Sequence, residues 1–261
     1  MTDKQTTDIE NTDEHVHNHN HVHDADEKFD NVDSTNELEQ LLRDIKKKLR
    51  LSMNGVISQS MRDKGLNYRI NFGVEYPRIK SISSEYTPSS ALATALWKSN
   101  IRECYIMATL LQPAEEFPAD LCDVWIEQLP SQEVAQYMAM NLLCKLPYAP
   151  QLSFSWIADT REMYQVCGYL TIARLLIKRP LMDERSRSEF VDQLIPAALD
   201  ESSAIRSAVY QVMRRFMEGD EQQAFLVCRA CDEWLSLSDD EKAQLPILKQ
   251  QLVCFIASVL A

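Results

Sequence analysis

The sequence has little glycine and lacks any long apolar run. Only five glycines occur among 261 residues, and stretches in which Val, Ile and Thr alternate with polar residues are scarce. Residues that favour helices, such as Ala, Leu, Met, Glu and Gln, are plentiful instead. No apolar run reaches the roughly 18 residues that a membrane-spanning helix requires. The composition therefore predicts an all-α protein that is not inserted in a membrane.

Histidine is absent from residue 24 onward. All five histidines of the chain lie near the N-terminus, at His15, His17, His19, His21 and His23. A histidine general base, and with it a Ser-His triad, is therefore excluded from the body of the protein.

The seven cysteines do not suggest a disulfide framework, because their number is odd and most of them lie within apolar helical patterns. The N-terminal segment is acidic and polar and has no apolar stretch typical of a signal peptide. We therefore expect a reduced, cytoplasmic protein.

Charge is unevenly distributed along the chain. The formal net charge is -12, and residues 1–40 account for most of it, with two Lys against twelve Asp and Glu. Residues 41–80 have the opposite character, with ten Lys and Arg against three acidic residues. This segment is the one expected to attract a polyanion. The near-neutral remainder of the chain counts against strong, non-specific DNA binding.

Residues 1–32 are poor in apolar side chains and rich in Asp, Asn, Thr and His. Such a segment cannot bury enough surface to offset the entropy of ordering, so we expect a disordered acidic tail before a helical domain at 33–261. Its alternating histidines predict a flexible site for Zn, Ni or Cu, with His15, His17, His19, His21 and His23 as ligands. The alternative is a solvated tail with incidental histidines.

Helical patterns extend through the rest of the chain. The capping-box spacing Ser34-x-x-Glu37 predicts a helix start, and Gly65 is a suitable terminator for that helix. Pro77 suits the first turn of another helix. Further helices are expected near 118–129, 132–145, 152–158, 161–178, 184–199, 203–218, 221–236 and 240–259.

Two segments repeat the same pattern, an Ile-Arg pair early in a helix that follows a polar turn. These pairs are Ile101-Arg102 and Ile205-Arg206. The second ends the run Leu194-Ile195-Pro196-Ala197-Ala198-Leu199-Asp200-Glu201-Ser202-Ser203-Ala204-Ile205-Arg206, which resembles a HEAT repeat. In that repeat Asp200 is expected to cap the second helix, and Arg206 to form hydrogen bonds across the turn. The sequence therefore predicts a HEAT-like repeat solenoid, an α-α superhelix of stacked helix pairs.

Three motifs, in this order, carry a more specific resemblance. They are Tyr76-Pro77-Arg78-Ile79-Lys80, then Leu96-Trp97-Lys98-Ser99-Asn100-Ile101-Arg102-Glu103, then Asp120-Leu121-Cys122-Asp123. Over roughly residues 50–220 the chain resembles the bacterial HEAT-like alkylpurine DNA glycosylases, the AlkD-like DNA alkylation repair proteins. Trp97, Ile101 and Arg102 are expected to be structural residues of this pattern.

The resemblance implies release of cationic N3- or N7-alkylated purines from DNA without a required cofactor. In that family an aspartate stabilises the positive charge that develops on the sugar, and Asp123 stands in its place. Two tryptophans of the family hold the lesion nucleotide. This chain has Ala119 at the first of these positions and Tyr164 near the second, with Trp156 as a further candidate aromatic.

Basic side chains form two candidate phosphate-binding sets. The first includes Lys46, Lys47, Lys48, Arg78 and Lys80, and the second comprises Arg161, Arg174, Lys178 and Arg179. Either set is equally compatible with a solvated helix face.

Two functions follow from the sequence. One is a DNA alkylation-repair protein that binds double-stranded DNA in a concave helical groove, with Asp123 catalytic and Tyr164 as the remaining aromatic wall. The other is a non-catalytic scaffold that uses the same groove for a protein or a nucleic acid, which the absence of tryptophan at position 119 favours. A third role, metal handling, would belong to the histidine tail.

Overall fold

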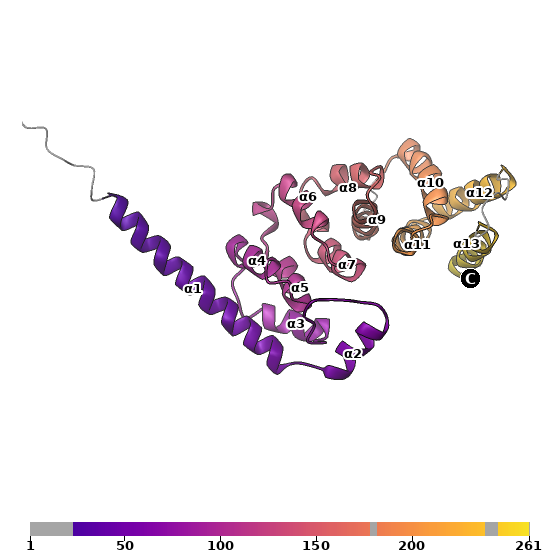
Figure 1. The fold of residues 1–261 in the computed structure, drawn as a ribbon. Helices are drawn as coiled ribbons and strands as arrows, with labels where there is room; N and C mark the ends of the chain where they lie inside the picture. The colour runs from indigo at the N-terminus through magenta and orange to yellow at the C-terminus, as the bar shows by residue number, and fades with distance from the viewer. Residues whose placement is uncertain (1–22, 178–181, 238–244, 261) are drawn as a thin grey trace, which may run out of the picture. The chain divides into compact units, whose positions relative to one another are not determined.

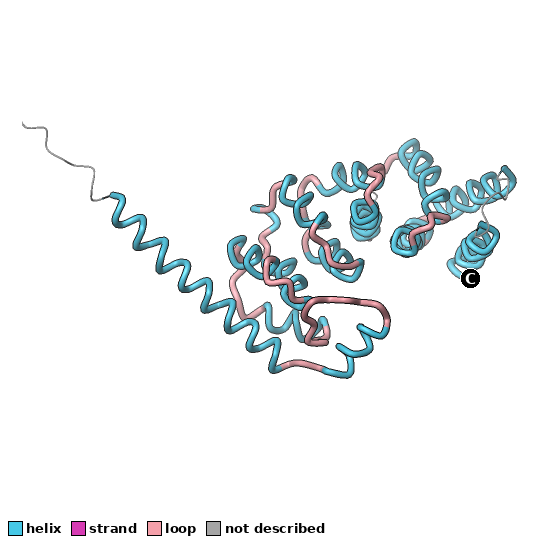
Figure 2. The backbone as a smooth tube through the Cα atoms, viewed as in Figure 1, coloured by secondary structure: helices cyan, strands magenta, loops and turns pink. Residues whose placement is uncertain are grey.

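Helices make up nearly all of the regular structure. A computed structural model describes the backbone of residues 23–177, 182–237 and 245–260, and side chains within 36–177, 182–236 and 246–260. In these ranges the chain forms helices and no strand, and Ile70 and Ile101 make an isolated parallel bridge (Figure 2). This outcome confirms the expectation of an all-α protein.

The helices follow one another with short connections. The first seven are α1 (His23–Leu51), α2 (Gly55–Asp63), α3 (Tyr76–Ser83), α4 (Ser90–Trp97), α5 (Arg102–Leu111), α6 (Ala119–Glu127) and α7 (Gln132–Asn141). Six more follow: α8 (Ala149–Ile157), α9 (Glu162–Leu176), α10 (Glu184–Ala198), α11 (Ser203–Met217), α12 (Glu221–Leu237) and α13 (Leu245–Leu260). Two 3₁₀ helices, Ala114–Glu116 and Leu143–Lys145, complete the set. None of the helices in the described ranges is long and apolar enough to cross a membrane.

The chain separates into two units, residues 1–41 and residues 42–261. The described part of the first unit belongs to α1, which begins at His23 rather than at Ser34, where the capping-box pattern predicts a start. Residues 1–22 of the expected tail lie outside the described residues. The expected ligands His15, His17, His19, His21 and His23 likewise lie outside the part of the chain whose side chains are described.

The expected helix from Ser34 towards Gly65 is wrong, because α1 ends at Leu51 and α2 begins at Gly55. Asn54 separates the two helices. Its side-chain oxygen accepts hydrogen bonds from the N–H groups of Val56 and Ile57, at 3.1 and 3.2 Å, and so caps α2. Pro77 lies in the first turn of α3, as the sequence predicts.

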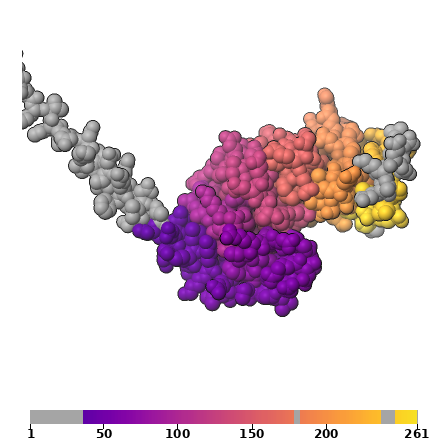
Figure 3. Space-filling view, viewed as in Figure 1, coloured from indigo at the N-terminus to yellow at the C-terminus, as the bar shows by residue number. Residues whose placement is uncertain are grey.

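The helices of residues 90–260 form two layers (Figure 1). In one layer α5, α7, α9, α11 and α13 pack successively against one another. The other layer contains α4, α6, α8, α10 and α12, of which α4, α8, α10 and α12 pack against the helix that follows them. In the space-filling view the colours from α4 to α13 follow the order of the sequence (Figure 3). We call α5, α7, α9, α11 and α13 the second-helix layer, because each is the second helix of its pair.

The turn between α10 and α11 shows what the arginine of the second Ile-Arg pair does. Arg206 donates hydrogen bonds to the carbonyl oxygens of Asp200 and Glu201, at 2.7 and 2.9 Å. This bonding across the turn is the role that the sequence predicts for Arg206. The cap is different, since the Ser202 hydroxyl accepts from the N–H groups of Ala204 and Ile205, whereas Asp200 accepts from the N–H of Ser202 itself.

Around the first Ile-Arg pair, the residues expected to be structural are buried. Trp97 is 3 % exposed and stacks on Trp125, with ring centroids 4.1 Å apart. Arg102 is 2 % exposed and donates to Val74, Glu103 and Glu133. Trp97, Ile101 and Arg102 are thus core residues, which confirms their expected structural role.

Candidate nucleic-acid interface

Asp123 lies on α6, with its side chain exposed. The indole N–H of Trp156, on α8, donates a hydrogen bond to Asp123 Oδ1 at 3.3 Å. Trp156 is itself only 4 % exposed. The structure therefore brings two of the sequence-predicted site residues together, with the carboxylate towards solvent and the ring within the protein.

Tyr164, in the first turn of α9, joins the same cluster. The backbone oxygen of Asp123 and Glu127 Oε1, both 3.3 Å from its hydroxyl, share the single hydroxyl proton as acceptors. Burial, together with the negative charge of Asp123, raises the pKa of Tyr164 to about 12, so the phenol is neutral at physiological pH. The side chain is 3 % exposed, which leaves little ring surface for stacking on a base.

Arg161 covers the Tyr164 ring, with its guanidinium carbon 3.5 Å from the ring centroid. The guanidinium also pairs with Glu127 at 2.9 Å and with Asp159 at 2.8 Å. The hydrogen bond from Arg161 lowers the pKa of Asp159 to about 2. A phosphate at Arg161 would therefore have to compete with two carboxylates that already bind it.

Asp123, Trp156, Arg161 and Tyr164 thus form one cluster where α6, α8 and α9 meet. We call it the Asp123 cluster. Its carboxylate is accessible, but both of its aromatic rings are packed into the protein.

The first basic set lies on α1 and α3. Lys48 is bound to Asp44 and Glu85, at 2.9 Å in each case, and Arg78 donates to Ser52 at 3.2 Å. Lys47 and Lys80 are exposed and Lys46 is half-buried. No interaction among the described residues connects this set with the Asp123 cluster.

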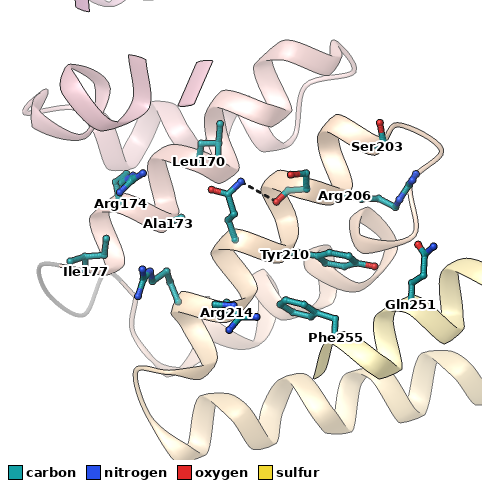
Figure 4. Close-up of a pocket in the computed structure, with 13 residues that line it drawn as sticks. Leu170, Ala173, Arg174, Ile177, Ser203, Arg206, Tyr210, Arg214, Gln251 and Phe255 are labelled. Atoms are coloured by element: carbon teal, nitrogen blue, oxygen red, sulfur yellow. Dashed lines mark hydrogen bonds between the residues drawn. The ribbon is translucent and has the colours of Figure 1, made fainter. Parts of the chain in front are cut away.

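A different group of arginines lines a pocket between α9, α11 and α13 that has a volume of about 510 Å³ (Figure 4). Arg174 comes from α9, and Arg206, Arg214 and Arg215 come from α11. No carboxylate is among the residues that line it. We call this site the arginine pocket. Four guanidinium groups without an acidic partner in the lining create a local positive potential that suits an anion.

The four arginines differ in how far they are already engaged. Arg206 is held by the turn carbonyls, and Arg215 forms an ion pair with Glu218 at 3.0 Å. Arg214 lies over the ring of Phe255, 5.5 Å from its centroid. Within the described residues, neither Arg174 nor Arg214 has a carboxylate partner. These two cations are the ones best placed to bind a ligand.

Sequence reasoning included Arg174 among the candidate phosphate ligands but missed Arg214 and Arg215. Lys178 and Arg179, from the same expected set, lie outside the described residues. The missed signal is a polar stripe of helical period along α11. It comprises Ser203, Arg206, Ser207, Tyr210, Gln211 and Arg214, opposite the buried residues Ile205, Val209, Val212 and Phe216.

Comparison with known proteins adds two findings. The family model described as DNA alkylation repair enzyme matches residues 35–226. A solved structure is similar to the chain with a TM-score of 0.67 at 15 % sequence identity, over 81 % of this chain and 94 % of that one. It represents a family of proteins related to the HEAT-like repeat DNA glycosylases, with affinity for branched DNA structures. A search of curated proteins gave no significant match. The structural similarity confirms the HEAT-like repeat fold.

Proposed function

We propose that this chain, which belongs to the DNA alkylation repair enzyme family, binds DNA through the second-helix layer. The arginine pocket is the observation that carries this proposal. Arg174 and Arg214 would contact phosphates, and Arg215 would do so by exchanging its ion pair with Glu218.

The acidic net charge of the whole chain does not conflict with this proposal. At physiological ionic strength, charges separated by more than about 8 Å through solvent are largely screened. A phosphate in the arginine pocket therefore responds mainly to the charges close to it, which include Arg174 and Arg214. The charge of -12 mostly reflects the acidic N-terminal forty residues.

The structurally similar protein belongs to a family with affinity for branched DNA. We therefore propose both duplex and branched DNA as ligands, with the phosphate backbone as the feature that they share.

Removal of the unpaired charges tests the proposal. In Arg174→Gln and Arg214→Gln, one charge-assisted hydrogen bond to phosphate is lost, and the association constant for a duplex should fall roughly tenfold for each variant. Arg185→Gln is the matched control, because the Arg185 side chain is 89 % exposed on α10 and lies outside the pocket. Binding should be measured by fluorescence anisotropy at constant salt. Equal affinities for all three variants would reject the arginine pocket as the DNA site.

Base excision is the second candidate function, and the Asp123 cluster is the observation that favours it. An exposed carboxylate near Trp156 and Tyr164 matches the electrostatic role that the family resemblance assigns to Asp123. The burial of both rings and the presence of Ala119 at the expected tryptophan position argue for binding without excision as the primary function.

Release of N7-methylguanine from methylated DNA separates the two functions. If excision occurs, Asp123→Asn should reduce the rate by roughly 100-fold or more, because one preorganised charge at the transition state is lost. If neither the wild type nor Asp123→Asn releases base above background, excision is rejected and DNA binding remains.

A further inference from the structure

The arginine pocket has a second kind of lining that phosphate binding alone does not require. Beside its arginines, α9 and its C-cap contribute Leu170, Ala173 and Ile177, and α11 and α13 contribute Tyr210 and Phe255 (Figure 4). Ile177 is 56 % exposed although it is large and apolar. A backbone phosphate gains nothing from such a wall, whereas a nucleobase does.

We infer that the arginine pocket holds one unpaired nucleotide of the bound DNA, with its base against this apolar and aromatic wall and its flanking phosphates on the arginines. This inference rests on the proposed function and specifies its substrate class. A base that remains stacked in a duplex presents only its edges in the grooves, so its flat face cannot reach the wall. A nucleotide outside the stack can present that face.

The aromatic part of the wall is preorganised. The rings of Tyr210 and Phe255 stack, with centroids 4.6 Å apart and an angle of 10° between their planes. Arg214 lies over the Phe255 ring of the same pair, 5.5 Å from its centroid. The stack therefore places a guanidinium and an aromatic surface next to each other, which is the combination that a phosphate and its base require.

Size and charge favour a nucleotide within a strand over an isolated anion. The volume of about 510 Å³ lies in the range of pockets that enclose small organic ligands. The cations come from two helices, with Arg174 on α9 and Arg214 and Arg215 on α11. One inorganic phosphate would leave part of this charge uncompensated, whereas a nucleotide within a strand brings a phosphate on each side. The amides of Gln211 and Gln251 supply donors and acceptors for the base edge.

Two duplexes that differ only by one unpaired thymine test the inference. The quantity to be measured is the ratio of their association constants, bulged over fully paired, at constant salt. We expect a ratio of about ten for the wild type, because one base gains a stacking surface. Tyr210→Leu and Phe255→Leu should bring the ratio towards one. Phe225→Leu should leave it unchanged, since Phe225 is 65 % exposed on α12 and lies outside the arginine pocket.

Gln251→Ala gives a second readout that does not depend on the stacked rings. Gln251 is exposed, so its truncation should leave the fold intact while it lowers the ratio several-fold. A wild-type ratio of one, with both duplexes bound, would overturn the inference and leave the proposed function standing. If the wild type bound neither duplex, the proposed function itself would be overturned. Thymidine 5′-monophosphate, added as a competitor, tests whether the pocket binds a free nucleotide instead. If it inhibits duplex binding at micromolar concentration, the ligand of the pocket is a free nucleotide and not one within DNA.

Discussion

At the residue scale, Arg102 shows how the helix pairs are joined. Its guanidinium donates to Glu133 on α7 at 2.9 and 2.5 Å, to Glu103 at 3.0 Å and to the Val74 carbonyl at 3.0 Å. The Tyr68 hydroxyl donates to Glu133 at 2.6 Å. A single buried cation therefore connects α5, α7 and the segment before α3.

Removal of that cation should strongly destabilise the fold. In Arg102→Met the Glu103 and Glu133 carboxylates lose their partner, and we expect the free energy of unfolding to fall by about 3–5 kcal/mol. Arg185→Met is the control, because its 89 % exposed side chain should change stability by no more than about 0.5 kcal/mol. Urea denaturation of both variants makes the comparison, and equal stabilities would contradict this account of Arg102.

The same ion pair makes stability depend on pH. Burial alone would raise the pKa of Glu133, but the hydrogen bonds and charge of Arg102 outweigh burial and lower it below its ordinary value of 4.5. The stabilisation is therefore present above the unfolded-state pKa and is lost as the pH falls through the lower pKa of the folded state. Acid titration of unfolding should show a smaller loss of stability below pH 4.5 in Glu133→Gln than in the wild type. Parallel profiles would show that Glu133 does not contribute.

The sequence predicted the role of a residue where that role depends on local contacts. It did not predict the exposure of side chains, which depends on how the helices pack. The bonds from Arg206 across its turn were predictable, since they join residues five and six positions apart. Asp123 and Tyr164, which the family resemblance assigns to one site, lie in one cluster, and the structure adds Trp156 and Arg161 to it. The burial of Trp156 and Tyr164 was not predictable, as it depends on how α6, α8 and α9 pack.

At the element scale, Gly168 sets the distance between α8 and α9. A Cβ atom at this position would lie 2.6 Å from Ile157 Cγ2 and 2.8 Å from the Ser153 carbonyl oxygen. Both neighbours belong to α8, and one of them is backbone. Glycine is therefore required here by close approach, although α9 is otherwise a regular helix.

Gly168→Ala should destabilise the protein by roughly 1–3 kcal/mol, because overpacking outweighs the usual preference for Ala over Gly within a helix. Gly55→Ala is the matched control, because a Cβ there would have no neighbour within 4 Å. That variant should be as stable as the wild type or up to about 1 kcal/mol more stable. Thermal or urea denaturation distinguishes the two, and a stabilised Gly168→Ala would contradict the close approach.

Helix positions from residue 119 to the C-terminal region were largely predictable, because amphipathic periodicity repeats with every pair. For example, the helix predicted at 184–199 is observed at Glu184–Ala198, and the helix predicted at 203–218 is observed at Ser203–Met217. The break between α1 and α2 was missed. No proline or glycine precedes it, and the Asn54 cap gives a weaker sequence signal.

At the scale of the whole molecule, an acidic N-terminal segment contrasts with an arginine pocket in the second-helix layer. Composition showed the first feature, but the second needed the structure, because Arg174 and Arg214 are forty residues apart and meet only when α9 packs against α11.

We propose that the N-terminal histidines bind a transition metal ion independently of DNA. Zinc titration by calorimetry should show uptake by the wild type and its loss when His15, His17, His19, His21 and His23 are all changed to Asn. DNA binding should be the same in both proteins without zinc. Equal zinc uptake would dismiss the histidines as ligands.

The dependence of duplex affinity on salt tests the DNA-binding account most directly. A plot of the logarithm of the association constant against the logarithm of NaCl concentration should have a negative slope for the wild type, because bound arginines release counterions from the phosphates. The double variant Arg174→Gln, Arg214→Gln should flatten that slope by about two, roughly one for each lost phosphate contact. A flat wild-type plot, or the same slope in both proteins, would contradict phosphate binding at the arginine pocket and favour a protein partner for this layer.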